Sequence, residues 1–294
     1  MKISQAAINR AAERLANKVY NGLHCWNGTA FVVAAALKML IPSWKMLDAK
    51  RAVLIPAFKV QLKKYFKMQQ AAAMQEYRSG HKVKLDKKVW REKYLEIMAA
   101  AYIKVLNGAA DHAYASIETP RKSVNKLWTE RNPFVNEYIG ETLPDIVDSI
   151  NQTTMDNIAA EISDGVDAGE GIDQIADRIE SVYEDAMDGG RSETIARTEV
   201  IRSYSAGTRE AYAESGVVAG KMWVATDDDR VRDSHWAANG QIVALDEPFD
   251  LDGMETDGPG ESGDPSEDIN CRCAIAPVTD PQEVADAQDQ QEEE

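Results

Sequence analysis

Three side chains between Lys221 and Val278 have the types and spacing of a small chemical site. His235 is one of four histidines in the chain, and Cys271 and Cys273 are two of its three cysteines. Thiolate and imidazole groups are preferred ligands of zinc, so the three residues permit a zinc site. The set is incomplete, and Cys-x-Cys is a less usual zinc motif than Cys-x-x-Cys. Candidates for the fourth ligand are Asp227, Asp229 and Asp233.

Two other interpretations of the same residues stay open. In a strand, Cys271 and Cys273 would point to one side and could pack as small apolar groups beneath a helix that carries His235. Alternatively, Arg272 and His235 could lower the pKa of a neighbouring thiol and make it reactive. Cysteines separated by one residue are too close for an unstrained disulfide, so we expect free thiols and a reducing compartment.

Short elements must position these side chains. The β-rich runs Lys221–Thr226 and Cys271–Val278 predict two strands. Between them, Asp229–Ala238 predicts a short helix that is followed by Gly240, a turn residue needing positive φ. Trp223 on the first strand is expected in the core, because an indole covers much apolar area. The result would be a small α+β unit closed by its first and last strands.

Charged residues around this unit favour ion pairs over a catalytic centre. The guanidinium fork pairs well with carboxylates, so a network joining two neighbouring helices is expected. The aspartate run that begins at Asp227 is typical of a turn and helix cap, with a divalent-cation site as the alternative. The predicted network consists of Arg197, Glu199, Asp229, Arg232 and Asp233.

The remainder of the chain predicts helices, which gives a mostly α protein with a small α+β C-terminal domain. We expect an elongated, basic helical region over residues 1–134, an acidic helical region over 135–220, the α+β block over 221–278 and a flexible acidic tail over 279–294. We also expect the C-terminal domain to fold without residues 1 to about 120. The predicted helices are 3–21, 30–40, 48–78 with a kink or a restart at Pro56, 90–106, 141–165, 171–187 and 191–215.

The net charge of −16 hides a strong asymmetry. Residues 1–134 hold 24 Lys and Arg against 9 Asp and Glu, whereas residues 221–294 hold 4 against 21. A basic end could contact DNA or an acidic partner, although solvated helix faces explain the same pattern. No signal peptide or membrane helix is predicted, because the longest apolar run, 29–41, is too short. The candidate contact residues are Lys59, Lys63, Lys64, Lys67, Lys82, Lys84, Lys87 and Lys88.

An ordered set of motifs resembles the phage head morphogenesis family typified by the Mu F-like minor head proteins. The set runs from about Pro144 to Val278: GIDQIADRI, IARTE, KMWVATDDDRVRDSH, LDEPF, GDP and INCRC. Residues 1 to about 135 carry no motif of this kind. The motif residues singled out as structural are Arg197, Thr198, Glu199, Trp223, Asp227, Asp229, Arg232, His235, Gly240, Asp264, Pro265, Asn270, Cys271 and Cys273.

The resemblance implies a structural role in a tailed phage. Proteins of this family are minor components inside the head, associated with the portal vertex and in some members with DNA packaging or delivery. The implied partners are a portal protein, a major capsid or scaffolding protein and packaged double-stranded DNA, with the host cytoplasm as the place of assembly. No cofactor is required by this role. Two alternatives are a phage enzyme, such as a metal-dependent nuclease or a transferase, that uses His235 as general base, and a stand-alone nucleic-acid-binding protein.

Overall fold

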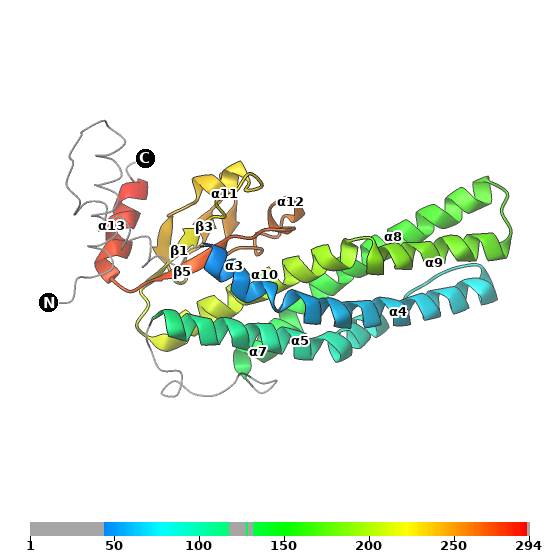
Figure 1. The fold of residues 1–294 in the computed structure, drawn as a ribbon, viewed down its shortest axis with the longest axis horizontal. Coiled ribbons are helices and arrows are strands. Elements are labelled where there is room, and N and C mark those ends of the chain that lie inside the picture. The colour runs from blue at the N-terminus through cyan, green and yellow to red at the C-terminus, as the bar shows by residue number, and fades with distance from the viewer. Residues whose placement is uncertain (1–43, 118–127, 129–131, 293–294) are drawn as a thin grey trace. The chain divides into compact units, whose positions relative to one another are not determined.

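The computed structural model describes residues 44–117, 128 and 132–292 (Figure 1). The predicted helices 3–21 and 30–40 lie outside these residues. The described chain forms two compact units that interleave along the sequence. Among the described residues, the helical unit comprises 52–107, 128 and 132–200, and the sheet unit comprises 44–51, 108–117 and 201–292. Helices α5 (Lys87–Ser116) and α10 (Arg191–Ser215) contribute residues to both.

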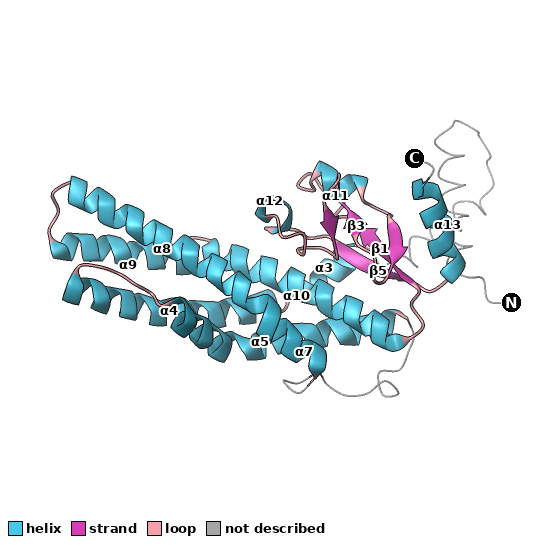
Figure 2. Ribbon diagram, turned by 180° about the vertical axis from the view of Figure 1, so that it is seen from behind, coloured by secondary structure: helices cyan, strands magenta, loops and turns pink. Residues whose placement is uncertain are grey.

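The helical unit is built from long amphipathic helices. Helix α9 packs against both α4 and α8 (Figures 1 and 2). On α4, Phe58, Leu62 and Phe66 recur every four residues and are buried. Tyr65 is also fully buried and donates a hydrogen bond of 2.6 Å to Asn151 Oδ1, so the core contains a polar link between α4 and α8. The elements are α4 (Ile55–Gly80), α5 up to residue 107, α7 (Pro133–Glu137), the π-helical turn η1 (Tyr138–Thr142), α8 (Leu143–Asp167), α9 (Ile172–Asp188) and the start of α10.

Of the two outcomes predicted for the helical stretch 48–78, a kink or a restart at Pro56, the structure shows the restart. Helix α3 (Trp44–Ala52) ends before α4 begins at Ile55. Pro56 lies in the first turn of α4, where its missing N–H breaks no helical hydrogen bond. The proline therefore starts a helix here instead of bending one.

The sheet unit contains a three-stranded antiparallel sheet in the order β2-β1-β5, drawn in magenta in Figure 2. The central strand β1 (Gly220–Val224) pairs with β2 (Ile242–Ala244) and β5 (Ala274–Val278). A two-stranded ribbon, β3 (Phe249–Asp250) and β4 (Glu255–Thr256), lies in the same unit. Two short helices, α11 (Asp233–Ala237) and α12 (Pro265–Asp268), interrupt the connections.

Two boundaries in this unit differ from the sequence-based prediction. The closing strand starts at Ala274 and not at Cys271, because the carbonyls of residues 272 and 273 accept hydrogen bonds from a side chain. The short helix begins at Asp233 and not at Asp229, because residues 228–231 form a turn stabilised by Asp228, which accepts from the backbone N–H of Arg230.

The acidic tail, predicted to be flexible, forms helix α13 (Pro281–Glu292). Asp280 accepts a hydrogen bond from the N–H of Gln282 at the start of this helix. Val284 is 6 % exposed, and α13 packs against β2 and β5. The apolar side chain of Val284 is therefore buried at the contact between this polar tail and the sheet.

The predicted fold class is confirmed: the described chain is mostly helical, with short antiparallel strands near its C-terminal end. Among the helices in the described ranges, none combines the length and the apolar character that crossing a bilayer requires.

Candidate functional site

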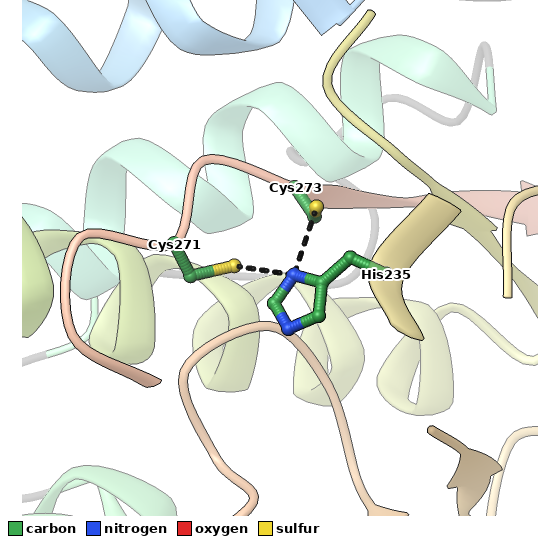
Figure 3. Close-up of side chains that lie close together, drawn as sticks. All are labelled: His235, Cys271 and Cys273. Atoms are coloured by element: carbon green, nitrogen blue, oxygen red, sulfur yellow. Dashed lines mark hydrogen bonds between the residues drawn. The ribbon is translucent and has the colours of Figure 1, made fainter. Parts of the chain in front are cut away.

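His235, Cys271 and Cys273 gather in the interior of the sheet unit (Figure 3). The Nδ1 atom of His235 lies 3.6 Å from Cys271 Sγ and 3.4 Å from Cys273 Sγ. All three side chains are buried, with exposed fractions of 2 %, 2 % and 1 %. His235 comes from α11, and the cysteines come from the segment that leads into β5. The structure thus brings together the three residues singled out from their types, and both cysteines are free thiols.

The other ring nitrogen of His235 faces a carboxylate. Its Nε2 atom lies 2.9 Å from Glu267 Oε2, although the N–H direction at this ring orientation does not point at that oxygen. Glu267 also accepts a hydrogen bond of 2.8 Å from the hydroxyl of Ser234, the neighbour of His235 on α11. Glu267 therefore favours a proton on Nε2, which leaves Nδ1 with a lone pair directed at the two sulfurs.

The two thiols differ in acidity. A shared hydrogen bond, together with burial, raises the pKa of Cys271, and the same hydrogen bond, together with His235, lowers the pKa of Cys273. The first negative charge of the pair is therefore carried by Cys273. Neither sulfur is open to solvent, so the acidic thiol is enclosed rather than presented to a substrate.

Arg51 on α3 binds the backbone of the cysteine segment. Its guanidinium donates hydrogen bonds of 2.5 Å to the carbonyl of Cys273 and 2.6 Å to the carbonyl of Arg272. The side chain is buried, and burial lowers the pKa of Arg51. A buried fork that binds two successive carbonyls fixes the path of the Cys-x-Cys backbone.

The chain approaches the cysteines through a loop that the GDP and INCRC motifs shape. Asp264 caps α12 by accepting from the N–H and hydroxyl of Ser266, and these hydrogen bonds lower the pKa of Asp264. Pro265 follows in the first helical turn. Asn270 has φ of +59°, a left-handed conformation that asparagine tolerates better than most residues. These residues therefore act on backbone geometry.

Asp268 in the same loop is buried and makes several polar contacts. It accepts from the N–H and hydroxyl of Ser262 and from the N–H of Gly263, and it lies 3.3 Å from Arg202 on α10. Arg202 also donates to the carbonyl of Gly260. This carboxylate connects the loop before the cysteines to the long helix.

The sheet unit contains ion pairs and hydrogen bonds of arginine that the sequence did not predict. Asp228 pairs with Arg272, which lowers the pKa of Asp228, while Arg232 donates to the carbonyl of Ile269. In the helical unit, Arg197 Nη2 lies 3.4 Å from Glu193 on the same helix. The aspartates considered as a fourth ligand do not join the ligand cluster of the described residues, and all are exposed: Asp227, Asp229 and Asp233.

Glu199 and Thr198 belong to the core of the helical unit. Glu199 is 3 % exposed and accepts a hydrogen bond of 3.1 Å from the hydroxyl of Tyr102. Burial and this carboxylate raise the pKa of Tyr102. The IARTE motif thus lies in a buried polar network, and Thr198 beside it is also buried.

Trp223 and Gly240 behave as the sequence predicted. Trp223 is 1 % exposed and meets His235 and Phe249 edge to face, with ring centroids 5.4 and 5.3 Å apart. Gly240 has φ of +87°. Lys221, for which the sequence predicted only a strand position, is fully buried and donates to the carbonyl of Asp257.

The lysines proposed as contact residues fall into two groups. Lys59 pairs with Glu193 at 3.0 Å and Lys63 pairs with Asp188, so acidic residues already neutralise them. The others are exposed, four of them in or next to the connection between α4 and α5: Lys64, Lys67, Lys82, Lys84, Lys87 and Lys88.

Sequence reasoning missed the polar residues that support the cluster. Arg51 and Arg202 have no local signal, because a helical arginine is usually solvated. Glu267 had one: an acidic residue next to a motif that supplies cysteine ligands is a candidate second-sphere partner for the histidine.

Comparison with known proteins agrees with the motif order. Residues 156–276 match the family described as Phage Mu protein F like protein. The predicted resemblance is confirmed. This Mu F-like segment contains α9, α10, His235 and both cysteines of the cluster.

Curated relatives of the chain include phage and bacterial proteins. The minor head protein GP7 of Bacillus phage SPP1 is 36 % identical over 143 residues, which are 47 % of this chain and 46 % of GP7. The NAD(+)--arginine ADP-ribosyltransferase EFV of Enterococcus faecalis is 32 % identical over 151 residues, 50 % of this chain and 30 % of EFV. The uncharacterized protein YqbB of Bacillus subtilis is 32 % identical over 106 residues, 32 % of each chain. The chain spans less than half the length of these relatives, and no solved structure gives a significant match.

Proposed function

We propose that the chain is a minor head protein of a tailed phage that acts by binding inside the capsid, at or near the portal vertex. The observation that carries this proposal is the Mu F-like match of residues 156–276 together with the similarity to the minor head protein GP7. Its role is in head assembly and in DNA packaging or delivery, with the portal protein and a capsid or scaffolding protein as partners.

The geometry of the sheet unit supports binding rather than turnover. His235 is 2 % exposed, and both of its ring nitrogens face protein groups. The cavity that Arg51 and His112 line has a volume of about 10 Å³, which suits one water molecule. Side chains of reactive type here hold backbone segments in place, which suits a rigid assembly component.

The exposed lysines supply a surface for an anionic partner. Lys82, Lys84, Lys87 and Lys88 lie within a stretch of seven residues, the first two in the connection between α4 and α5 and the last two at the start of α5. Phosphate groups of packaged DNA would be attracted to such a cluster without any sequence readout.

The location is tested in phage particles. Heads are purified from infections in which the gene for this chain is deleted and replaced by a tagged full-length copy, and the tag is located by electron microscopy. We expect a few copies at one vertex of the heads. Normal, infectious heads that lack the tagged chain would contradict the proposal.

The lysine surface is tested with two matched variants of the full chain. Replacing Lys82, Lys84, Lys87 and Lys88 with Gln removes free charges, whereas Lys59→Gln with Lys63→Gln removes charges that are already paired. Each phosphate contact on duplex DNA contributes about 0.9 to the slope of log K against log salt. We expect the first variant, which removes four charges, to reduce the slope by about 3.6 and the second to change it by less than about 1. Equal effects of the two variants would contradict this role.

A second candidate function is that of a phage enzyme, which the similarity to the ADP-ribosyltransferase EFV favours. The full chain would be incubated with NAD⁺ and an arginine-containing acceptor, and separately with DNA and Mg²⁺ or Zn²⁺. Turnover that His235→Ala abolishes in a folded variant would replace the head-protein proposal. Turnover that survives this change would assign catalysis to other residues.

A further inference from the structure

The three buried ligand atoms of the sheet unit have the spacing of a metal site. A tetrahedral zinc ion with Zn–N of about 2.0 Å and Zn–S of about 2.3 Å separates nitrogen from sulfur by about 3.5 Å. The Nδ1 atom of His235 lies 3.6 and 3.4 Å from the two sulfurs, and all the ligand atoms lie within 4.8 Å of one another. We propose that His235, Cys271 and Cys273 bind one zinc ion that has a structural role.

Hydrogen bonding alone leaves this arrangement incompletely satisfied. Nδ1 has one lone pair, which accepts one proton, yet two sulfurs approach it at similar distances. A divalent ion at the centre would bind all three atoms at once. On binding, each thiol releases its proton to solvent, and the two thiolates balance the charge of the ion.

The surroundings of the histidine resemble those of a metal ligand. Histidines that bind metals usually direct the other ring nitrogen at a carboxylate, which fixes the tautomer and the ring orientation. Glu267 lies 2.9 Å from Nε2 and is itself held by Ser234.

The cysteine segment is also prepared for a metal. Arg51 fixes the carbonyls of residues 272 and 273, and the left-handed Asn270 turns the chain just before Cys271. Both sulfurs are therefore placed before any ion binds. Among the described residues, no further histidine, cysteine or carboxylate joins the group.

Zinc at this position would connect α11 to the start of β5. His235 and Cys271 are 36 residues apart, so the ion would close a long loop of the sheet unit. Because the ligands are buried, the ion would act on stability rather than on a substrate.

The metal content of the full chain is the direct test. Protein purified from zinc-supplied cells without chelator should contain one zinc per chain, and removal of zinc should lower the thermal unfolding midpoint, with recovery on addition of Zn²⁺. Folded wild-type protein that holds no zinc and shows no shift with added Zn²⁺ would overturn the proposal. This result would leave the head-protein function untouched.

Cobalt identifies the ligands. The zinc-free chain titrated with Co²⁺ should show sulfur-to-cobalt charge transfer and the intense visible bands of a tetrahedral ion at one equivalent. Cys271→Ser and Cys273→Ser should each weaken or remove the charge-transfer band, while Cys25→Ser keeps it. A spectrum that depends on Cys25 instead would contradict the assignment.

The second-sphere role of Glu267 has its own measurement, which does not depend on folding of the ligand variants. Glu267→Gln should reduce zinc affinity by about 10- to 100-fold. Glu261→Gln is the matched control, since Glu261 belongs to the same unit but pairs with Arg209. Equal affinities of both variants and the wild type would remove Glu267 from the site.

Discussion

Arg51 offers the sharpest test of how the Cys-x-Cys segment is held. In Arg51→Met, a side chain of similar length replaces the guanidinium, and the carbonyls of Arg272 and Cys273 lose their donors. Hydrogen bonds from a charged donor contribute about 1.5–3 kcal/mol each, but the variant also avoids the cost of burying a cation. We therefore expect a loss of about 3 kcal/mol in the local stability of the sheet unit.

Hydrogen exchange measured by mass spectrometry reads this loss directly. Amides of residues 271–278 should exchange about 100-fold faster in Arg51→Met, since each 1.4 kcal/mol corresponds to about a factor of ten. Arg51→Lys keeps the charge without the fork and should fall between the variant and the wild type. Unchanged exchange over this segment in Arg51→Met would refute the supporting role of the buried arginine.

Three further variants test other parts of the sheet unit. Gly220→Ala should lower stability and increase exchange across α13, because a Cβ there would meet the carbonyl of Val243 and the side chain of Val284 at 2.6 Å; Gly140→Ala, with open space around it, should not. Gly240→Ala should lower the free energy of unfolding, measured with urea, by about 1 kcal/mol, because φ is +87° there. The added Cβ would meet no atom within 4 Å, so the whole effect comes from the backbone conformation. Burial lowers the pKa of Lys221 to about 8 from its ordinary 10.5, so the unfolded chain binds more protons between these values and stability should rise with pH across them. Lys221→Met should remove about 2 kcal/mol of that rise between pH 8 and 10, and an unchanged pH profile would disprove the buried charge.

The sequence predicted the bounds of a helix well where a glycine lies at each of its ends. Helix α10 runs from Arg191 to Ser215, as the sequence predicted, because Gly190 and Gly216 take positive φ at its ends. Positive φ is costly for other residue types, so these two positions specify the boundaries regardless of what packs against the helix. The strand start at Cys271 was wrong for the opposite reason, since a distant arginine decides which carbonyls are free to pair.

The candidate site also has features that the sequence predicts and features that only the tertiary structure determines. His235, Cys271 and Cys273 were found from residue type alone, and the approach of the histidine Nδ1 atom to within 3.6 Å of both sulfurs is a tertiary property that agrees with it. The pairing of Lys59 with Glu193 depends instead on how α4 lies against α10, which periodicity does not encode. The sequence therefore predicts a basic region, but only the fold determines which of its lysines are paired with acidic residues.

The boundaries of the sheet unit lead to a last prediction, which reverses the expectation that the C-terminal domain folds without the first 120 residues. The Mu F-like segment begins at residue 156, yet Leu47 packs with Val224, Ala274 and Ala276 in one buried cluster, and Arg51 holds the cysteine segment.

Removing residues 1–127 would expose this cluster and leave the carbonyl of Cys273 buried without its donor, in addition to removing the hydrogen bond from Tyr114 to Glu214. We therefore expect a fragment of residues 128–294 to show little hydrogen-exchange protection in β1 and β5, whereas a fragment of residues 44–294 keeps it. Equal protection in the two fragments would show that the Mu F-like segment folds by itself and that the contacts of α3 are dispensable. Because the missing donor comes from a region that carries no family motif, the unit that folds is larger than the unit that sequence comparison detects.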